Sequence, residues 1–482
     1  MIRIVRQFTL VNCDSIQLLS TKLQNCAGLC VLNYSSQPVI GVYPKWQLVA
    51  LAATNTLLRT RLGLQQQCIT LTENFFDALK QQSSMHAESQ PHDQTVSALS
   101  TQTIRTGDKV FNGGLMGFIG YDLAASQMIA LQQVESPTAL MGEYDIFFKQ
   151  EVSQLGDTYW QLYGPDLPEL HEIYVYLREL TSDCAASRNT IKPITLKLEQ
   201  AFQPVWQFAQ YQQAFDKIQH YLKQGDCYQV NLTQPFEARM TGSLIATIDP
   251  LMRLTKANYG GFMKYGEFEL LSCSPELFIE FNVSGELVTK PIKGTRPRHP
   301  DAEIDAALKQ QLIDSEKDRS ENLMIVDLLR NDLGVYAQTG SVSVPALFKV
   351  ESFAQVHHLV SEIRATLKPD ASPLDVLFSA LPGGSITGAP KIRAMQIIDE
   401  LEAQSRGAYC GSMGFLNYDG TGCFNILIRS LQKRGNTLTA WAGGGITIAS
   451  NCEDEYQECL DKIGAILNCV NDLGADCHAQ DN

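Results

Sequence analysis

Residues 408–447 carry the pattern that most limits the fold of this chain. Apolar runs alternate there with two turn signals, Asp419-Gly420 and Gly435-Asn436, which are typical of tight connections between antiparallel strands. We therefore predict a three-stranded antiparallel meander. Its middle strand, residues 424–429, is apolar on both faces, and this pattern indicates a central strand that is covered on both sides.

Arg429 ends this middle strand, so we expect its side chain to be substantially buried. A buried guanidinium must meet an anion. The anion is either a protein carboxylate in a buried ion pair or a carboxylate of a bound ligand, and the residues alone leave both readings open.

The length of 482 residues allows two or three average domains, or one large α/β unit with a smaller lobe. No apolar run approaches the length of a membrane span and no basic-then-apolar leader begins the chain, so we expect a cytoplasmic protein without a membrane partner. The formal net charge of −14 disfavours nucleic acid as a partner. An acidic protein that binds an anionic substrate must concentrate positive charge locally. The 13 cysteines are odd in number and lack paired CxxC spacing, which predicts buried reduced thiols.

One such local concentration is the proline-bounded basic stretch at residues 291–298 (PIKGTRPR). Strands predicted over residues 270–281 and 287–292 deliver it at a strand end, and Gly294 frees the backbone beside Lys293. Lys293 is then either a positioned amine or part of a solvated basic turn.

Upstream of that stretch, apolar residues at helical spacing predict a helix over residues 208–224 that stops at Gly225. Residues 227–232 then form a predicted strand. Asn231 therefore lies just after a helix-to-strand corner.

A second helix carries a carboxylate on its apolar stripe, because Glu321, Met324 and Leu328 share one face at i, i+3 and i+7. Glu321 is either a metal ligand or lies beyond the buried end of the stripe.

A third helix follows the glycines of residues 442–446 (AGGGI) and places Glu455, Glu458 and Lys462 on one face. This row is either a surface row with a Glu458–Lys462 ion pair or, with Glu321 as a third oxygen donor, a site for a hard dication. The glycines would let a ligand carboxylate approach backbone N–H groups. Residues 382–391 (PGGSITGAPK) are either a plain helix-entry turn or an anion or hydroxyl site at a helix N-terminus.

Together these segments resemble component I of the chorismate-utilising enzymes, the family of the anthranilate, aminodeoxychorismate, isochorismate and salicylate synthases. The resemblance is dense over residues 205–468 and rests on GDCYQVNL, SPE, PIKGTRPR, ENLMIVDLLRND, HHLVSEI, PGGSITGAPK, RGAYCGSMG, ILIRS and AGGGI. It extends more weakly into residues 113–123 (GGLMGFIGYDL).

The resemblance implies an α+β fold in which large antiparallel sheets form a central sandwich with helices outside. It divides the chain into an N-terminal lobe (1–150), a connection (151–204), a chorismate-binding catalytic domain (205–468) and a polar tail (469–482). The lobe is expected to contribute strands to the sandwich.

The resemblance also implies roles for single residues. Mg²⁺ would be the cofactor, held by Glu321, Glu455 and Glu458. Substrate carboxylates would be bound by Tyr409, Arg429, Lys462, Gly388 and the backbone of Gly443, Gly444 and Gly445. Catalytic roles fall to Lys293, His358, Glu276, Asn231 and Thr387, with Thr387 and His358 lining the reacting ring and His358 assisting departure of the C4 hydroxyl as a general acid.

Two positions favour one branch of the family. Members that add water resemble one another in having a lysine where this chain has Gln229, so water addition is not expected. Lys293 stands where the anthranilate synthases have alanine and the aminodeoxychorismate synthases have lysine, and Asn231 fits the latter branch.

The implied reaction converts chorismate and ammonia to 4-amino-4-deoxychorismate, a precursor of p-aminobenzoate and folate. Lys293 would attack C2 and expel the C4 hydroxyl, and ammonia would then attack C4 and expel the lysine. The chain has no Gly-x-Cys-x-Gly nucleophile elbow, so a separate glutamine amidotransferase subunit is expected as partner in a heterodimer. The alternatives are an anthranilate synthase component and a catalytically silent chorismate-binding regulatory subunit.

Overall fold

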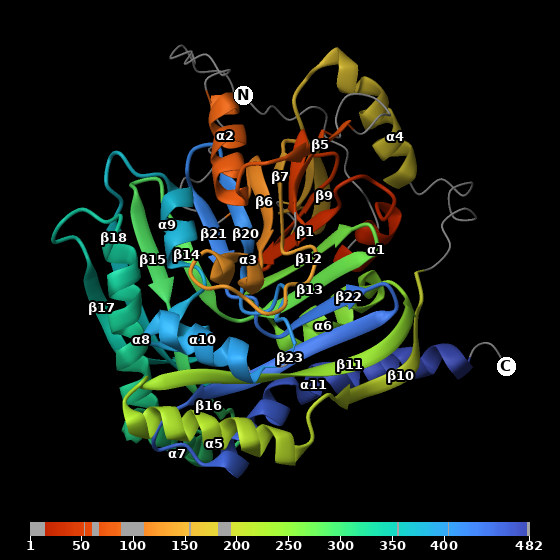
Figure 1. Ribbon diagram of the computed structural model, residues 1–482. Coiled ribbons are helices and arrows are strands. Elements are labelled where there is room, and N and C mark those ends of the chain that lie inside the picture. Colours follow the sequence, from red (N-terminus) through yellow and green to blue (C-terminus); the bar gives the residue numbers. More distant parts are fainter. Residues whose placement is uncertain are drawn as a thin grey trace.

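The computed structural model describes residues 15–52, 54–59, 67–87, 110–153, 156–181, 194–353, 356–402 and 404–479. Two large sheets dominate this part of the chain, and the pairings between their strands are antiparallel. Figure 1 shows the sheets stacked at the centre with helices around them. The predicted antiparallel sandwich is therefore confirmed.

The first sheet has eleven strands in the order β10-β11-β23-β22-β13-β12-β1-β2-β8-β9, with β19 paired to β11. In chain order its strands are β1 (Cys30–Tyr34), β2 (Gln37–Gly41), β8 (Phe147–Val152), β9 (Thr158–Tyr163), β10 (Leu196–Pro204), β11 (Gln229–Gly242), β12 (Tyr259–Tyr265), β13 (Phe268–Ser274), β19 (Gly388–Ala389), β22 (Ser430–Arg434) and β23 (Thr437–Ile446).

The second sheet has twelve strands in the order β16-β18-β15-β14-β21-β20-β6-β7-β3-β4-β5, with β17 paired to β18. In chain order they are β3 (Trp46–Ala50), β4 (Asn55–Arg59), β5 (Gln67–Leu71), β6 (Gly114–Ile119), β7 (Ala139–Tyr144), β14 (Leu277–Phe281), β15 (Glu286–Lys290), β16 (Ile292–Pro297), β17 (Ser343–Ser352), β18 (Val356–Thr366), β20 (Ser412–Asn417) and β21 (Gly422–Asn425).

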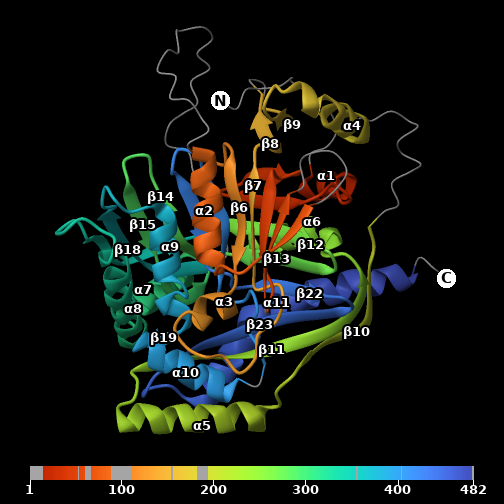
Figure 2. The same ribbon diagram turned by 45° about the horizontal axis from the view of Figure 1, so that its top comes forward.

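Helices cover the outer faces of both sheets, as Figures 1 and 2 show from two directions. Helix α8 packs on β16 and β18, α10 and α5 pack on β11, and α11 runs along β10 and β23. The helices are α1 (Ile16–Lys22), α2 (Phe75–Ala87), α3 (Tyr121–Ser126), α4 (His171–Thr181), α5 (Phe208–Gln224), α6 (Ile248–Thr255), α7 (Ala302–Asp314), α8 (Glu316–Gly334), α9 (Pro373–Ala380), α10 (Lys391–Leu401) and α11 (Cys452–Ala479), with short 3₁₀ turns η1 (Pro168–Leu170), η2 (Leu244–Thr247) and η3 (Gly384–Ile386).

The hydrophobic core is divided by the period-two alternation of the strands. Along β6, Met116 and Phe118 face the cluster between the sheets, whereas Leu115 and Ile119 join the cluster under the outer helices. Both faces of a strand are then apolar, which explains why so many strands lack a polar side.

The predicted meander over residues 408–447 is wrong. Strands β20 and β21 form a hairpin in the second sheet, whereas β22 and β23 form a hairpin in the first. The expected middle strand ends at Asn425, and the chain crosses between the sheets before resuming at Ser430. Both predicted turns are present, but the crossing segment remains largely buried and so has the hydrophobicity of a central strand.

The N-terminal lobe contributes strands to the sandwich, as expected. Strands from residues 30–163 belong to the same two sheets as those from residues 196–446, and residue 150 lies inside β8. The expected polar tail at 469–482 continues α11 as far as Ala479, because Val470 and Gly474 still pack, the latter against Leu198.

Two further expectations concern membranes and thiols. None of the helices in the described ranges is long and apolar enough to cross a membrane. The cysteines that the structure describes are free thiols and most of them are buried, which confirms the reading of the cysteine pattern.

Candidate active site

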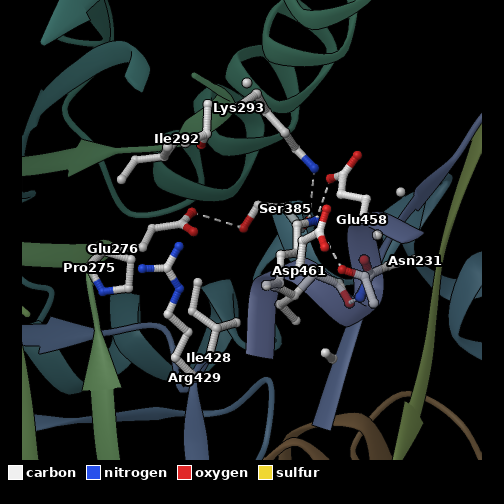
Figure 3. Close-up of a pocket in the computed structure, with 18 of the residues that line it drawn as sticks. Asn231, Pro275, Glu276, Ile292, Lys293, Ser385, Ile428, Arg429, Glu458 and Asp461 are labelled. Atoms are coloured by element: carbon white, nitrogen blue, oxygen red, sulfur yellow. Dashed lines mark hydrogen bonds and ion pairs between the residues drawn. The ribbon is translucent and has the colours of Figure 1, made fainter. Parts of the chain in front are cut away.

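A cavity of about 650 Å³ opens where the edge of the second sheet meets helices α8 and α11 and strand β23. The residues that sequence reasoning proposed and that line it are Asn231, Glu276, Lys293, Glu321, His358, Tyr409, Arg429, Gly443, Gly444, Gly445, Glu455, Glu458 and Lys462. They come from strands, helices and connections far apart in the sequence. Figure 3 draws 18 of the lining residues and labels ten of them, and several side chains point into the cavity.

Lys293 lies in strand β16 rather than in a basic turn beyond a strand end, because β16 pairs with β18 along residues 292–297. The register shifts between Lys293, opposite Leu359, and Thr295, opposite His358, so that Gly294 forms a bulge. Gly294 has φ +76°, a conformation that favours glycine. The bulge turns the half-buried Lys293 towards η3, where its Nζ lies 3.5 Å from the carbonyl oxygen of Ser385.

Glu276 precedes β14 and is 6% exposed. Ser385 Oγ donates a hydrogen bond of 3.3 Å to its carboxyl group. Burial raises the pKa of Glu276 to about 7, although the charge of Lys293 and the hydrogen bond from Ser385 act to lower it. The group is therefore divided between its protonated and ionised forms near neutrality, as an acid–base catalyst requires.

His358 lies in β18 with its Nδ1 2.9 Å from Thr295 Oγ1. Burial, followed by the charge of Arg429, lowers its pKa to about 4. The imidazole is accordingly neutral at pH 7 and can donate a hydrogen bond, but it holds no extra proton to transfer.

Arg429 lies in the crossing between the two sheets, with φ +51°. Its backbone carbonyl accepts a hydrogen bond from Cys273 N, which fixes the segment. In the part of the chain that the structure describes, its guanidinium forms no ion pair. Burial lowers its pKa, although the charge of Glu276 acts to raise it. Figure 3 shows it pointing towards Glu276 inside the cavity. Of the two readings left open by the sequence, the geometry favours a ligand anion.

The three carboxylates predicted to hold Mg²⁺ line the cavity from two helices, Glu321 from α8 and Glu455 and Glu458 from α11. Glu321 Oε1 is buried without a hydrogen-bond partner among the described residues. Burial raises the pKa of Glu321, and the charge of Glu455 raises it further. Gly444 leaves open space beside these carboxylates. A Cβ at this position would fill that space and lie 3.1 Å from Glu455 Oε2.

Two lysines hold the other carboxylates. Lys317 Nζ lies 2.9 Å from Glu455 Oε1, and Lys462 Nζ lies 2.7 Å from Glu458 Oε1. Within the described ranges, no three acidic, His or Cys side chains are grouped closely enough to hold a metal ion. The donor chemistry nevertheless suits Mg²⁺, since the set consists of carboxylate oxygens with one orphaned atom and free space beside them. The predicted Glu458–Lys462 pair is present, and both of its residues also line the cavity.

Tyr409 and the glycines of β23 form another wall. The ring of Tyr409 stacks on Trp441 with 5.9 Å between centroids. Gly443 accepts a hydrogen bond of 3.0 Å from Lys462 Nζ through its carbonyl oxygen. A Cβ on Gly445 would meet the Gln229 amide at 2.8 Å. Because these glycines lack side chains, β23 lies close to its neighbouring strands and its cavity side stays open.

Thr387 and Gly388 do not line the cavity. Thr387 is fully buried and its hydroxyl donates to Gly383 O at 3.0 Å, while Gly388 pairs with Val230 in β11. The wall in this segment consists of Ser385 and Ile386. Asn231 does reach the cavity, and its Nδ2 donates to Ile386 O at 3.0 Å.

Sequence reasoning missed Lys317, Asp318, Ser385 and Trp441 among the lining residues. Lys317 left a readable signal, because it precedes Glu321 by four residues and therefore shares its helix face. For Ser385, the only sequence signal is its position in a glycine-rich turn.

Comparison with known proteins now identifies the family. The model of the chorismate binding enzyme family matches residues 47–468. This chain belongs to that family. Among curated relatives, aminodeoxychorismate synthase component 1 of Salmonella typhimurium is 42% identical over 370 residues, which cover 75% of this chain and 77% of the relative. The component 1 protein of Escherichia coli is 41% identical with the same coverage.

A solved structure supports the same assignment. Anthranilate synthase component I from Streptococcus pneumoniae superposes with a TM-score of 0.72 at 26% identity, covering 89% of this chain and 92% of that one. The menaquinone-specific isochorismate synthase of Escherichia coli has a TM-score of 0.67 at 19% identity, covering 98% and 94%, and shows the shared fold alone.

Proposed function

We propose that this chain converts chorismate and ammonia to 4-amino-4-deoxychorismate, a step towards p-aminobenzoate and folate. The observation that carries the proposal is Lys293, an amine placed by a glycine bulge in the same cavity as the buried acid Glu276. The relatives named aminodeoxychorismate synthase component 1 support the same reaction.

In the first step, Lys293 gives up its ammonium proton to solvent and the free amine attacks C2 of chorismate. The C2–N bond forms, the ring double bond shifts, and the C4–O bond breaks. Protonated Glu276 donates its proton to the departing oxygen, so the leaving group is water. We assign this transfer to Glu276 rather than to His358, because the imidazole is neutral and its pKa of about 4 leaves it no proton to give.

In the second step, ammonia attacks C4, the double bond shifts back, and the C2–N bond breaks. Glu276, now ionised, accepts a proton from the attacking nitrogen, while the electron pair returns to Lys293. Two successive allylic displacements place the amino group on the face that the hydroxyl occupied.

The charged groups of the cavity would hold the substrate. Arg429, which forms no ion pair with a protein carboxylate among the described residues, would bind one substrate carboxylate in a charge-assisted pair. The backbone of Gly443 to Gly445, with Tyr409 and Lys462, would border the other. His358 would donate a hydrogen bond near the reacting ring, and Asn231 would help to shape the wall.

Mg²⁺ would be held by Glu321, Glu455 and Glu458. When bound, it would supply positive charge to the ring carboxylate of chorismate and neutralise the acidic wall.

The ammonia is proposed to come from glutamine through a separate amidotransferase subunit in a cytoplasmic heterodimer. The relatives' designation as component 1 fits a multi-component enzyme. Free ammonium salts would replace this partner in an assay of the single chain.

The test is incubation of the purified chain with chorismate, Mg²⁺ and ammonium at mildly alkaline pH, with products identified by mass spectrometry. We expect a nonaromatic product that retains the enolpyruvyl group and that is lost in Lys293→Ala. Lys290→Ala is the matched control, since Lys290 pairs with Glu362 one strand away and does not line the cavity.

Two other outcomes would replace the proposal. Anthranilate with pyruvate would identify an anthranilate synthase, and no turnover by folded wild-type protein would indicate a silent chorismate-binding subunit.

A further inference from the structure

Lys317 lines the cavity and forms an ion pair with Glu455 of the acidic wall. It lies in the first turn of α8, one turn before Glu321, and reaches across to α11. Burial lowers the pKa of this lysine, but the carboxylates of Glu455, Glu321 and Glu458 outweigh burial and raise it. Its Nζ lies 2.9 Å from Glu455 Oε1, and the residue lines the same cavity as Glu321 and Glu458.

The two partners of this ion pair differ in exposure. The side chain of Glu455 is 2% exposed, whereas that of Lys317 is 43% exposed. A buried carboxylate without a counter-charge is costly, so Glu455 needs a cation whether or not metal is present. Among the described residues, its Oε1 accepts one further hydrogen bond besides that from Lys317, from Ser450 Oγ at 2.7 Å.

The lysine can also leave. Much of its stem is exposed, and a long flexible side chain reaches solvent by changing rotamer without moving the helix. A divalent cation at the three carboxylates would stand close to this ammonium, and the two positive charges would repel each other.

We propose that Lys317 is a tethered counter-ion that holds the carboxylate site together without metal and leaves Glu455 when a divalent cation binds. This inference rests on the proposed Mg²⁺ site of Glu321, Glu455 and Glu458. Lys317 then sets the affinity for the ion: the metal must displace an internal cation, so removal of that cation strengthens metal binding.

The test measures Mg²⁺ binding by isothermal titration calorimetry with the full chain, in the absence of chorismate and ammonium. We expect Lys317→Gln to bind Mg²⁺ about tenfold more tightly than wild type, within the usual range of coupling between two sites. Thermal unfolding without metal should begin at a lower temperature in this variant, and added Mg²⁺ should raise its midpoint more than that of wild type.

Lys290→Gln is the matched control. Lys290 also forms a lysine–glutamate pair of 2.9 Å, with Glu362, but outside the cavity. Its loss should leave Mg²⁺ affinity unchanged. Glu321→Gln, added to Lys317→Gln, should remove the gain, because Glu321 supplies the orphaned oxygen.

Equal or weaker Mg²⁺ binding by Lys317→Gln overturns the inference. Failure of both proteins to bind Mg²⁺ overturns it together with the proposed metal site. Neither result depends on the reaction, because no substrate is present. A chain that binds Mg²⁺ as expected but forms no aminated product would refute the proposed reaction and leave the role of Lys317 standing.

Discussion

Lys293 and Glu276 face one cavity from neighbouring parts of the second sheet, and the charge of Lys293 opposes the rise that burial imposes on the pKa of Glu276. The result is a carboxyl group with a pKa of about 7 that interacts electrostatically with an amine of the same cavity. Nucleophile and acid are thus coupled through their charges, and the reaction we propose uses them together.

Glu276 should make the protein less stable as the pH rises. Its folded pKa of about 7 lies above the ordinary value of 4.5, so the folded state keeps a proton that the unfolded state has lost. The free energy of unfolding should therefore fall between these two pKa values and stay lowered above pH 7, by about 3 kcal/mol in all. Denaturant titrations at several pH values measure this.

Glu276→Gln should remove that pH dependence while disabling the reaction. At pH 8 the variant should be more stable than wild type by about 2–3 kcal/mol, and its turnover should fall by roughly 10²- to 10⁴-fold, the usual contribution of a general acid. The control is Glu286→Gln, on the neighbouring strand and paired with Arg364 outside the cavity. If Glu276→Gln were no more stable than wild type at pH 8, Glu276 would not be a buried carboxyl group that ionises in the folded protein.

Gly294→Ala should cost both stability and activity. A Cβ there would lie 2.7 Å from Leu312 Cδ1 and 2.8 Å from Asp318 Cγ, at a φ that already disfavours alanine. We expect a loss of about 2–4 kcal/mol and a lower kcat, because the bulge orients Lys293.

The control for this substitution is Gly285→Ala. Gly285 has a similar φ of +74°, but a Cβ there would have no atom within 4 Å, so the variant isolates the backbone cost of about 1 kcal/mol. If Gly294→Ala and Gly285→Ala lost the same stability and had the same kcat, the close contacts of a Cβ at position 294 would have no effect. The bulge would then not require glycine for steric reasons.

Arg429→Lys should weaken chorismate binding without unfolding the protein. Its guanidinium forms no ion pair among the described residues, so we expect a loss of roughly tenfold to a hundredfold in affinity, as for a hydrogen bond to a charged group, with little change in stability. Calorimetric titration with chorismate and thermal unfolding measure the two effects.

Arg406→Leu provides the contrast, because Arg406 binds Glu402 and two backbone carbonyls while it is 2% exposed. Its loss should destabilise the protein by about 3–5 kcal/mol. If Arg429→Lys behaved in the same way, Arg429 would be a structural residue and not a substrate ligand.

Much of the site was readable from the sequence because its elements have local signals. Apolar spacing predicted the helix over residues 208–224, and the structure ends α5 at Gln224 with Gly225 at φ +80°. The row of Glu455, Glu458 and Lys462 followed from helical periodicity alone. Family resemblance then joined these separate elements into one cavity.

The errors arose where hydrophobicity does not distinguish between structures. A segment that crosses between two packed sheets is largely buried, so residues 426–429 resemble a central strand. Likewise, the stretch around Lys293 contains two prolines and a glycine, which suggest a loop, yet a bulge accommodates them in an edge strand. In both places the structure depends on pairing with strands that are distant in the sequence, which local sequence patterns do not identify.

The most direct test of the account is intact-protein and peptide mass spectrometry of the chain incubated with chorismate and Mg²⁺ in the absence of ammonia. We predict an adduct of chorismate minus water on Lys293, discharged when ammonium is added and absent from Lys293→Ala. Wild-type protein that makes 4-amino-4-deoxychorismate with ammonium but never carries this adduct, even in rapidly quenched samples, would contradict nucleophilic catalysis by Lys293.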